Sequence, residues 1–161
     1  MIRPARATDA PALVALLNHW IVNTAITFNP VPKTEADILA MIADKAAAGH
    51  AFLVAEDAGT LIGQASYGQF RGGVGYKTCM EHSISLLPDI PRRGLGRALL
   101  TAVEDHARTQ GAHQMIAGVS GENAAGQAFH ARMGYTHTAT IPEAGFKFGR
   151  FIDLVLMQKF L

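Results

Sequence analysis

The amino-acid sequence predicts one α/β domain built around a mixed sheet. Two amphipathic helical patterns come first; strand-like runs follow, interrupted by two further helical patterns. No repeat, low-complexity tract or linker divides the chain. Its 161 residues suffice for one core, and a composition of 49% apolar and 17% charged residues is typical of a globular protein.

The first fifty residues predict two helices joined by a loop. Residues 8–11 place a capping side chain before a proline, which favours a helix start. The apolar stripe of this helix comprises Leu13, Leu16, Leu17, Trp20 and Ile21. A second helix is expected from Thr34, where Asp37 completes a capping box, to Gly49. The loop at 24–33 lies between them.

The rest of the chain alternates between strands and helices. We expect strands over 52–56, 61–67, 81–87, 115–119, 135–141 and 151–157, and helices over 95–111 and 123–133. Between the second and third strands, the glycine-rich segment 68–75 predicts a mobile loop that shapes a site. A second loop is expected around Gly145 and Gly149.

Charge and cysteine usage narrow the class of protein. The net charge is +1 and no Lys/Arg-rich run occurs, so we expect no nucleic-acid partner. The start lacks a secretory pattern, and no apolar run approaches the roughly 20 residues that span a membrane. Cys79 is the single cysteine, which suits a reducing compartment. We therefore expect a cytoplasmic protein without a membrane partner. The histidines show no metal-ligand spacing, so no metal is expected.

An anion-binding loop is predicted between the third strand and the third helix. Its residues are Arg92, Arg93, Gly94, Leu95, Gly96 and Arg97. Two glycines let the backbone approach an anion, and a helix start adds free amides and a positive dipole. A P-loop would need Lys and Ser/Thr after Gly96, and a dinucleotide fingerprint would need glycine at position 99, which is Leu. A pyrophosphate fits this loop. An ordinary glycine turn that opens a surface helix stays open as the alternative.

This loop and a downstream segment resemble the GCN5-related N-acetyltransferase (GNAT) superfamily across nearly the whole chain. The Q/R-x-x-G-x-G/A signature matches up to Gly96, with Pro91 where Gln or Arg is usual. A second segment begins at Asn123 and closes with the Met-Gly-Tyr at 133–135. The resemblance implies the GNAT fold over residues 1–161, with a mostly antiparallel sheet flanked by helices. It also implies acetyl-CoA as co-substrate, with its pyrophosphate on the loop amides and its pantetheine arm beside Asn123.

Further segments narrow the resemblance to the phosphinothricin / methionine sulfoximine acetyltransferase branch. They are Asn18 and the stretches 24–29, 65–68, 81–83 and 145–150. Enzymes of that branch acetylate the α-amine of small amino-acid analogues and form homodimers. The resemblance therefore implies a small-molecule amine as substrate, attacked directly in a ternary complex, and a homodimer. Another acceptor amine (a polyamine, a drug amine or a protein N-terminus) and a non-catalytic CoA-binding sensor stay open.

Acetyl transfer requires a base and stabilisation of the carbonyl oxygen. Glu81, at the start of the strand that leads to the anion loop, is our candidate for general base, with a structural salt bridge as the alternative. His130 stands where relatives place a tyrosine acid, and it could equally cap or pack its helix. The family uses a backbone amide on the strand, which points to Ile84, Ser85 and Leu86 beside the pantetheine.

The acceptor needs an aromatic wall and a partner for its carboxylate. By position in the branch the candidates are Phe28, Val74, Gly75, Tyr76 and Lys77, with Lys77 as the carboxylate partner. His82 is discounted because neighbouring strand residues point to opposite faces. A covalent route through Cys79 is less favoured, because no base partner is recognisable in the sequence.

Overall fold

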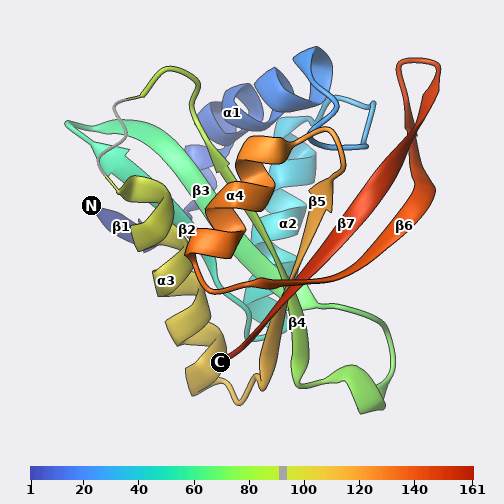
Figure 1. Ribbon diagram of the computed structural model, residues 1–161. Helices are drawn as coiled ribbons and strands as arrows, with labels where there is room; N and C mark the ends of the chain where they lie inside the picture. The colour runs from blue at the N-terminus through green and yellow to red at the C-terminus, as the bar shows by residue number, and fades with distance from the viewer. Residues whose placement is uncertain (91–93) are drawn as a thin grey trace.

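The computed structural model describes residues 1–90 and 94–161, and these form a seven-stranded sheet in the order β1-β2-β3-β4-β5-β7-β6 (Figure 1). The strands are β1 (Ile2–Pro4), β2 (Phe52–Asp57), β3 (Thr60–Gln69), β4 (Cys79–Leu86), β5 (Gln114–Ser120), β6 (Thr136–Lys147) and β7 (Arg150–Phe160). The helices are α1 (Ala10–Asn23), α2 (Glu35–Ala47), α3 (Leu95–Thr109) and α4 (Ala124–Arg132), with 3-10 turns η1 (Ala7–Asp9) and η2 (Val74–Tyr76).

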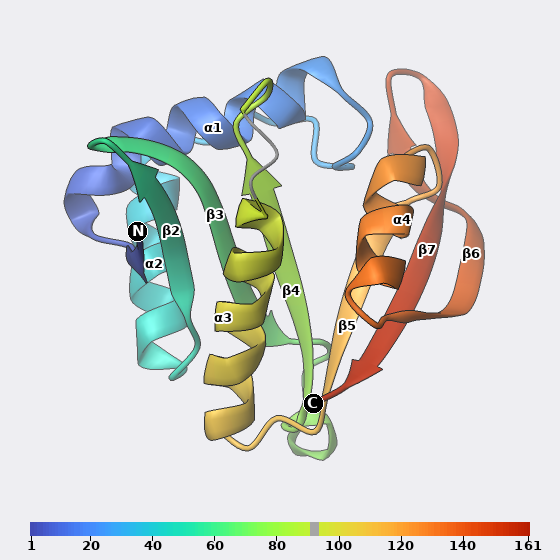
Figure 2. The same cartoon turned by 60° about the vertical axis from the view of Figure 1, so that its left-hand side comes forward.

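The helices cover both faces of the sheet (Figure 2). On one face α3 and α4 pack on the larger apolar cluster, with Leu99 and Val103 of α3 fully buried. On the other face α1 and α2 pack on β2 through Leu13 and Ile38. All strand pairs are antiparallel except β4 with β5. The expected mixed, mostly antiparallel sheet flanked by helices is therefore confirmed.

Strands β4 and β5 separate along their length. In the described chain they pair over Cys79–Glu81 and Gln114–Ile116 alone. Beyond that point the two strands diverge, as Figure 2 shows. Parallel neighbours normally continue their hydrogen bonds along the ladder, so the divergence leaves one edge of β4 facing open space. The sheet thus supplies a gap directly after Glu81.

Two expected loops are shorter than the sequence suggests. Strand β3 continues to Gln69, because Gly68 pairs with Glu81 of β4. Strand β6 continues to Lys147, past a register shift between Ile141 and Gly145. That irregularity interrupts the alternation by which the strand would be recognised. The remaining turn is two residues long, with φ of +53° at Phe148 and +73° at Gly149.

Helix starts follow the sequence in one case and depart from it in another. The capping box of α2 is confirmed: Thr34 Oγ1 accepts from the amide of Asp37, and the Asp37 carboxylate accepts from the amide of Thr34. Asp9 does not cap α1, because its carboxylate accepts from the Arg3 guanidinium and from the amide of Arg6, where it completes a capping box of η1. No helix of the described residues has the length and apolar character needed to cross a bilayer.

Candidate active site

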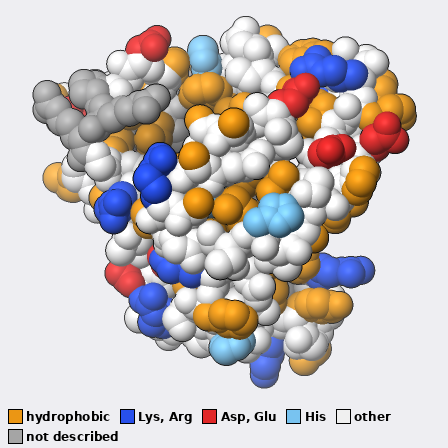
Figure 3. Space-filling model, viewed as in Figure 1, with side chains coloured by type: hydrophobic (Ala, Val, Ile, Leu, Met, Phe, Trp, Pro, Cys, Tyr) orange, Lys and Arg blue, Asp and Glu red, His pale blue; other side chains and the backbone are white. Residues whose placement is uncertain are grey.

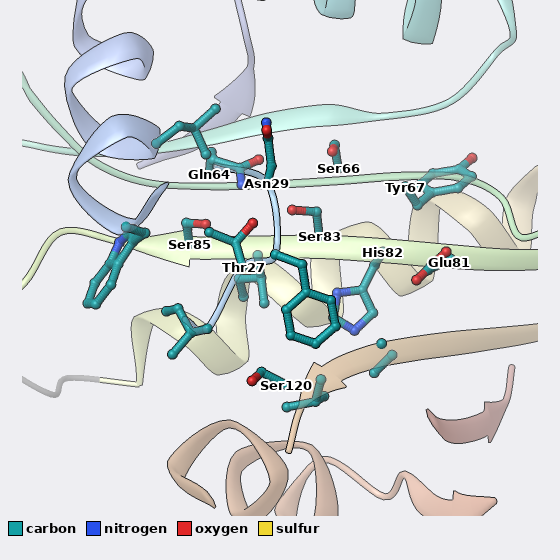
Figure 4. Close-up of a pocket in the computed structure, with 18 of the residues that line it drawn as sticks. Thr27, Asn29, Gln64, Ser66, Tyr67, Glu81, His82, Ser83, Ser85 and Ser120 are labelled. Carbon is teal, nitrogen blue, oxygen red and sulfur yellow. The ribbon is translucent and has the colours of Figure 1, made fainter. Parts of the chain in front are cut away.

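A cavity of about 720 Å³ opens where β4 and β5 separate. The loop after α1, helix α2, strands β3, β4 and β5, and helix α4 all contribute to its walls. Figure 4 shows the polar side chains of this cavity, with Glu81 and Ser85 toward opposite ends of β4 and His82 and Ser83 between them. The cavity therefore follows the free edge of β4 from Glu81 toward the start of α3.

Glu81 lies at the closed end of the gap. It is the last residue of β4 that pairs with β5, opposite Ile116, and Gly118 follows two residues later. A Cβ on Gly118 would lie 2.8 Å from Oε1 of Glu81, so glycine leaves the space that this carboxylate uses. Burial raises the pKa of Glu81, and the positive charge of Lys45 opposes that rise. The carboxylate forms no ion pair with any described residue, so the salt-bridge alternative finds no partner there.

His82 and His130 form a buried pair beside Glu81. Their rings stack with centroids 5.0 Å apart, and their Nε2 atoms are 3.2 Å apart. Nδ1 of His130 lies 2.7 Å from the carbonyl oxygen of Gly126, which can only accept, so this nitrogen carries the proton. Neutral His130 therefore accepts at Nε2 from Nε2–H of His82. Nδ1 of His82 then bears a lone pair, and it has no partner among the described residues.

The pair is neutral near neutral pH. Burial lowers the pKa of His82 to about 3, and the nearby His130 adds to that effect. Burial also lowers the pKa of His130. A general acid must hold a proton to deliver, and neither the tautomer nor the pKa direction favours one on Nε2 of His130. The acid role of His130 stays a prediction that this geometry does not support, although the residue does line the cavity.

The strand predicted to hold the coenzyme arm runs along the cavity. Ile84 and Ser85 line it, while the carbonyl oxygen of Leu86 accepts from Nε1 of Trp20 at 2.8 Å. That bond fixes the end of β4 against α1. Asn123 lines the cavity from the other side, and its Oδ1 accepts from the amide of Gly126 at 2.8 Å, which caps α4. The backbone of β4 and Asn123 thus face one another across the gap.

The anion loop is described from Gly94 onward; Arg92 and Arg93 lie outside the described residues, as does Pro91. Gly94 has a φ of +77° and precedes α3, which begins at Leu95 with no side-chain cap. The first amides of the helix, through Arg97, therefore have no partner within the helix. A Cβ on Gly96 would come within 3.3 Å of the Phe129 ring. The amides at the start of α3 can therefore bind an anion, while Gly96 on the same turn packs closely against the ring of Phe129.

Phe28 lines the cavity as expected, and the end of β6 holds its loop in place. A Cβ on Gly145 would lie 2.5 Å from the Phe28 ring, so glycine makes room for the aromatic wall. Lys147 is 2% exposed, and its Nζ donates to the carbonyl oxygens of Ile21 (2.6 Å), Thr24 (2.7 Å) and Thr27 (2.8 Å). A single buried ammonium thus fastens the end of α1 and the loop before Phe28.

The other four predicted acceptor residues lie away from this cavity. Val74, Gly75 and Tyr76 form the exposed turn η2, and none of them lines the cavity. Lys77 borders a second, smaller cavity, which shares the lining residues Tyr67 and Gln69 with the first. The mobile site-shaping loop was expected at 68–75, but β3 takes up its first residues and the remainder points outward. A single copy of the chain therefore does not bring these residues to Glu81.

The structure adds to the cavity lining one residue that the sequence analysis discounted, His82, and one that it did not consider, Lys45. His82 does point to the face opposite Glu81, yet it reaches the same cavity because the gap between β4 and β5 opens to both faces. Lys45 reaches the cavity from α2. No local pattern marks either one, since both depend on how distant elements meet. The described residues contain no group of three or more His, Cys, Asp or Glu that could hold a metal ion.

Comparison with known proteins places this site in a family. The model of the acetyltransferase (GNAT) family matches residues 16–135. The chain is 38% identical over 157 residues to the L-amino acid N-acyltransferase MnaT of Escherichia coli strain K12, covering 98% of this chain and 91% of that protein. It is also 38% identical over 157 residues to the L-methionine sulfoximine/L-methionine sulfone acetyltransferase of Salmonella typhimurium strain LT2. That match covers 98% of this chain and 92% of that protein.

A solved structure agrees with these relatives. The structure of yncA from Salmonella typhimurium with its cofactor acetyl-CoA matches with a TM-score of 0.95 and 37% identity, covering 100% of this chain and 93% of that chain. The family resemblance of the sequence is thereby confirmed over the part of the chain that holds the gap, the base candidate and the helix start. The chain belongs to the acetyltransferase (GNAT) family and is an acetyltransferase.

Proposed function

We propose that the chain transfers the acetyl group of acetyl-CoA to the α-amine of a small amino-acid analogue of the methionine sulfoximine, methionine sulfone or phosphinothricin type. The observation that carries this proposal is the carboxylate of Glu81, which has no ion-pair partner within residues 1–90 and 94–161 and lies at the point where β4 and β5 separate. It lies at the end of the gap that an extended coenzyme arm would follow. The names of the relatives support the acceptor class.

Glu81 acts as the general base. A free α-amine has a pKa near 8, so most of it is protonated at neutral pH and cannot attack. A carboxylate whose pKa is raised by burial holds a proton more strongly than an ordinary glutamate, while remaining ionised when the pH lies above that raised value. Glu81 takes the proton from the amine, directly or through a water. Its place on β4 keeps the base beside the nitrogen that attacks.

The residues of the gap fit acetyl-CoA. At its free edge β4 offers the backbone amide of Ile84 to an extended arm, since the alternate residues, Ser85 among them, direct their amides to β3. Asn123 faces this edge. The uncapped amides from Gly94 to Arg97 suit a pyrophosphate at the helix start. Bound there, acetyl-CoA supplies an activated acetyl thioester. A backbone amide of β4 stabilises the charge that develops on the carbonyl oxygen.

Direct attack in a ternary complex is the route we propose. Cys79 does not line the cavity, and burial and the nearby Glu81 charge both raise the pKa of its thiol. A thiol with a raised pKa is a poor nucleophile, because the thiolate is the reactive form. The amine itself therefore attacks the acetyl group, and no side chain of this chain carries the acetyl group in between.

The lining of the cavity favours an amino acid over a polyamine. Among its described residues Glu81 is the one carboxylate, whereas Lys33 and Lys45 bring positive charge. A polyamine would need several acidic partners, and an extended peptide would need an open acidic groove. A small zwitterion matches one carboxylate and a nearby cation. We keep another amine, or a sensor that binds CoA without turnover, as outcomes of the test below.

A homodimer in the cytoplasm is the remaining part of the proposal. Exposed aromatic side chains on the β6–β7 hairpin support an interface, since Phe146, Phe148 and Phe151 are each more than half exposed. Figure 3 shows apolar side chains among charged ones at the upper right, where Figure 1 places this hairpin. If residues 74–77 contact the acceptor, they would reach it from the second copy of the dimer. Light scattering after gel filtration tests this part: a monomer at micromolar concentration would contradict it.

The central experiment is a thiol-release assay with acetyl-CoA. The acceptors are methionine sulfoximine, methionine sulfone, phosphinothricin, a polyamine and a short peptide. We expect turnover with the first three and a loss of roughly 100- to 10,000-fold in kcat/KM for Glu81→Gln, the range for a general base. Glu122→Gln is the matched control, because Glu122 forms an exposed ion pair with Arg150 outside the cavity.

Three outcomes separate the alternatives. Turnover with the polyamine or peptide alone would overturn the acceptor class. Acetyl-CoA binding without thiol release from any acceptor would favour the sensor. An unchanged rate in Glu81→Gln would remove Glu81 as the base. The variant should remain folded: a carboxyl pKa raised by folding means that its ionisation destabilises the fold above that pKa, and glutamine removes that ionisation.

A further inference from the structure

Lys45 extends from α2 into the cavity toward Glu81. A Cβ on Gly68 would lie 2.7 Å from Nζ of Lys45, so glycine leaves the space that the ammonium uses. Gly68 of β3 pairs directly with Glu81 of β4. Glycines thus flank both charges, Gly68 below the ammonium and Gly118 beside the carboxylate. Gly68 on β3 and Gly118 on β5, the two strands that flank β4, therefore leave room for two opposite charges in one cavity.

The two charges do not neutralise each other. No ion pair within 4.0 Å joins them, and Nζ of Lys45 makes no hydrogen bond to any described residue. Burial lowers the pKa of Lys45, while the charge of Glu81 opposes that change. Each group is only partly exposed and has therefore lost part of its hydration without gaining a partner among the described residues, although each feels the charge of the other. A partly buried charge of this kind is stabilised when a ligand brings the complementary group.

We propose that the Lys45 ammonium binds the acidic group of the acceptor while Glu81 receives its amine, an inference that rests on the proposed function. An α-amino acid carries an amine and a carboxylate on one carbon. With the amine at Glu81, the carboxylate of the same molecule can face Lys45. The separation of the two protein charges, with no direct contact between them, is what a bridging zwitterion requires.

The other cations near the cavity are less suited to this role. Lys33 already has an acidic neighbour at the start of α2: hydrogen bonds from the amide and hydroxyl of Thr34 lower the pKa of the Asp37 carboxyl, and the charge of Lys33 adds to that effect. Within one copy of the chain Lys77, the partner expected from the sequence, borders the other cavity. From a second copy Lys77 would be the competing cation, which the Lys77→Met variant below tests. His50 also lies near Lys45, and burial together with the Lys45 charge lowers its pKa, so it is a neutral neighbour. Among the described residues, Lys45 is the cation that faces Glu81.

Binding at Lys45 would also strengthen the base. The Lys45 charge holds the pKa of Glu81 below the value that burial alone would set. A carboxylate bound to the ammonium offsets that charge, so the pKa of Glu81 rises when an amino acid is bound. Glu81 then becomes a better proton acceptor in the loaded site than in the empty one. An amine without an acidic group would not produce this change.

The test compares acetylation of methionine sulfone with that of its carboxamide, which keeps the amine and loses the negative charge. The quantity measured is the ratio of kcat/KM for the acid to kcat/KM for the amide. For Lys45→Met we expect this ratio to fall roughly 10- to 150-fold, the range for one hydrogen bond to a charged group. The lower amine pKa of the amide affects wild type and variant equally. Lys45→Arg should retain most of the ratio.

Matched variants make the result decisive. Arg108→Met should leave the ratio unchanged, because Arg108 forms an exposed ion pair with Asp105 outside the cavity. Circular dichroism should show that Lys45→Met is folded. Equal losses on acid and amide, or a ratio that falls with Lys77→Met instead, would overturn the role of Lys45. If the wild type acetylates neither compound, the proposed function fails and the inference fails with it. If the wild type acetylates methionine sulfone and Lys45→Met keeps its preference, the inference alone is overturned.

Discussion

Replacing Lys147 by methionine tests whether one buried ammonium holds the acceptor loop. Lys147→Met keeps an unbranched apolar stem and removes three hydrogen bonds. The Ile21 carbonyl is buried and would lose its partner at a cost of about 2–3 kcal/mol, while water can replace the ammonium at Thr24 and Thr27, at about 0.5–1 kcal/mol each. Relief of the buried charge offsets about 1 kcal/mol of this loss. The expected net decrease in the free energy of unfolding is about 3 kcal/mol.

The assay is urea unfolding followed by circular dichroism, at two protein concentrations so that an oligomer would be noticed. For a chain of this length a decrease of about 3 kcal/mol lowers Tm by roughly 6–12 °C. Arg108→Met is the control, since its ion pair with Asp105 is exposed and should contribute at most about 0.5 kcal/mol. Relative to wild type, the folded variant should lose more affinity for the acceptor than for acetyl-CoA. A decrease below about 1 kcal/mol, or one equal to the control, would refute the reasoning.

Three further predictions follow from the site. Gly145→Ala should push the Phe28 ring by about 1 Å to restore ordinary contact, raising KM for the acceptor several-fold with little change for acetyl-CoA; equal changes in both would contradict it. The rate should rise with pH through the raised pKa of Glu81, because only the ionised base acts, and this acid limb should vanish in Glu81→Gln; a persisting limb would point to another group. In NMR titrations the ring resonances of His82 should keep a constant chemical shift between about pH 5 and about pH 8, since burial lowers its pKa to about 3. A titration near pH ~6.5 would contradict the buried, neutral pairing of His82 with His130.

The fold was predictable wherever local patterns repeat. The four helices fall where apolar periodicity placed them, and the capping box of Thr34 marks the start of α2 to the residue, although the helix ends at Ala47, before the expected stop at Gly49. Strand β1 was missed because three residues ending in proline carry no alternation. The far half of β6 was missed because its register shift breaks the alternation near Gly145. The predicted strand ends were wrong where pairing with another strand, rather than a local sequence pattern, extends the strand.

The candidate site was predictable only along one strand. Glu81, Ile84 and Ser85 share β4, so their order in the sequence gives their order in the cavity. Lys45 reaches the cavity from a helix more than thirty residues earlier, and only the folded chain shows that its ammonium lies over Gly68. Lys77 lies four residues before Glu81, yet its loop turns away. Closeness in sequence was a poor guide to the acceptor pocket, because side chains from separate elements build it.

The position of β7 in the sheet has a consequence for synthesis of the protein. Strand β7 follows every other strand along the chain, yet it lies between β5 and β6. Until residues 150–160 emerge from the ribosome, the edge of β5 that later pairs with β7, around Gly118, has no neighbouring strand. At ~5–20 residues per second, the thirty residues from the end of β5 to the start of β7 take on the order of 2–6 s. During that interval a nascent chain exposes an open, apolar strand edge, which is a template for aggregation. Shortened chains that lack β7 should therefore precipitate rather than fold with reduced activity.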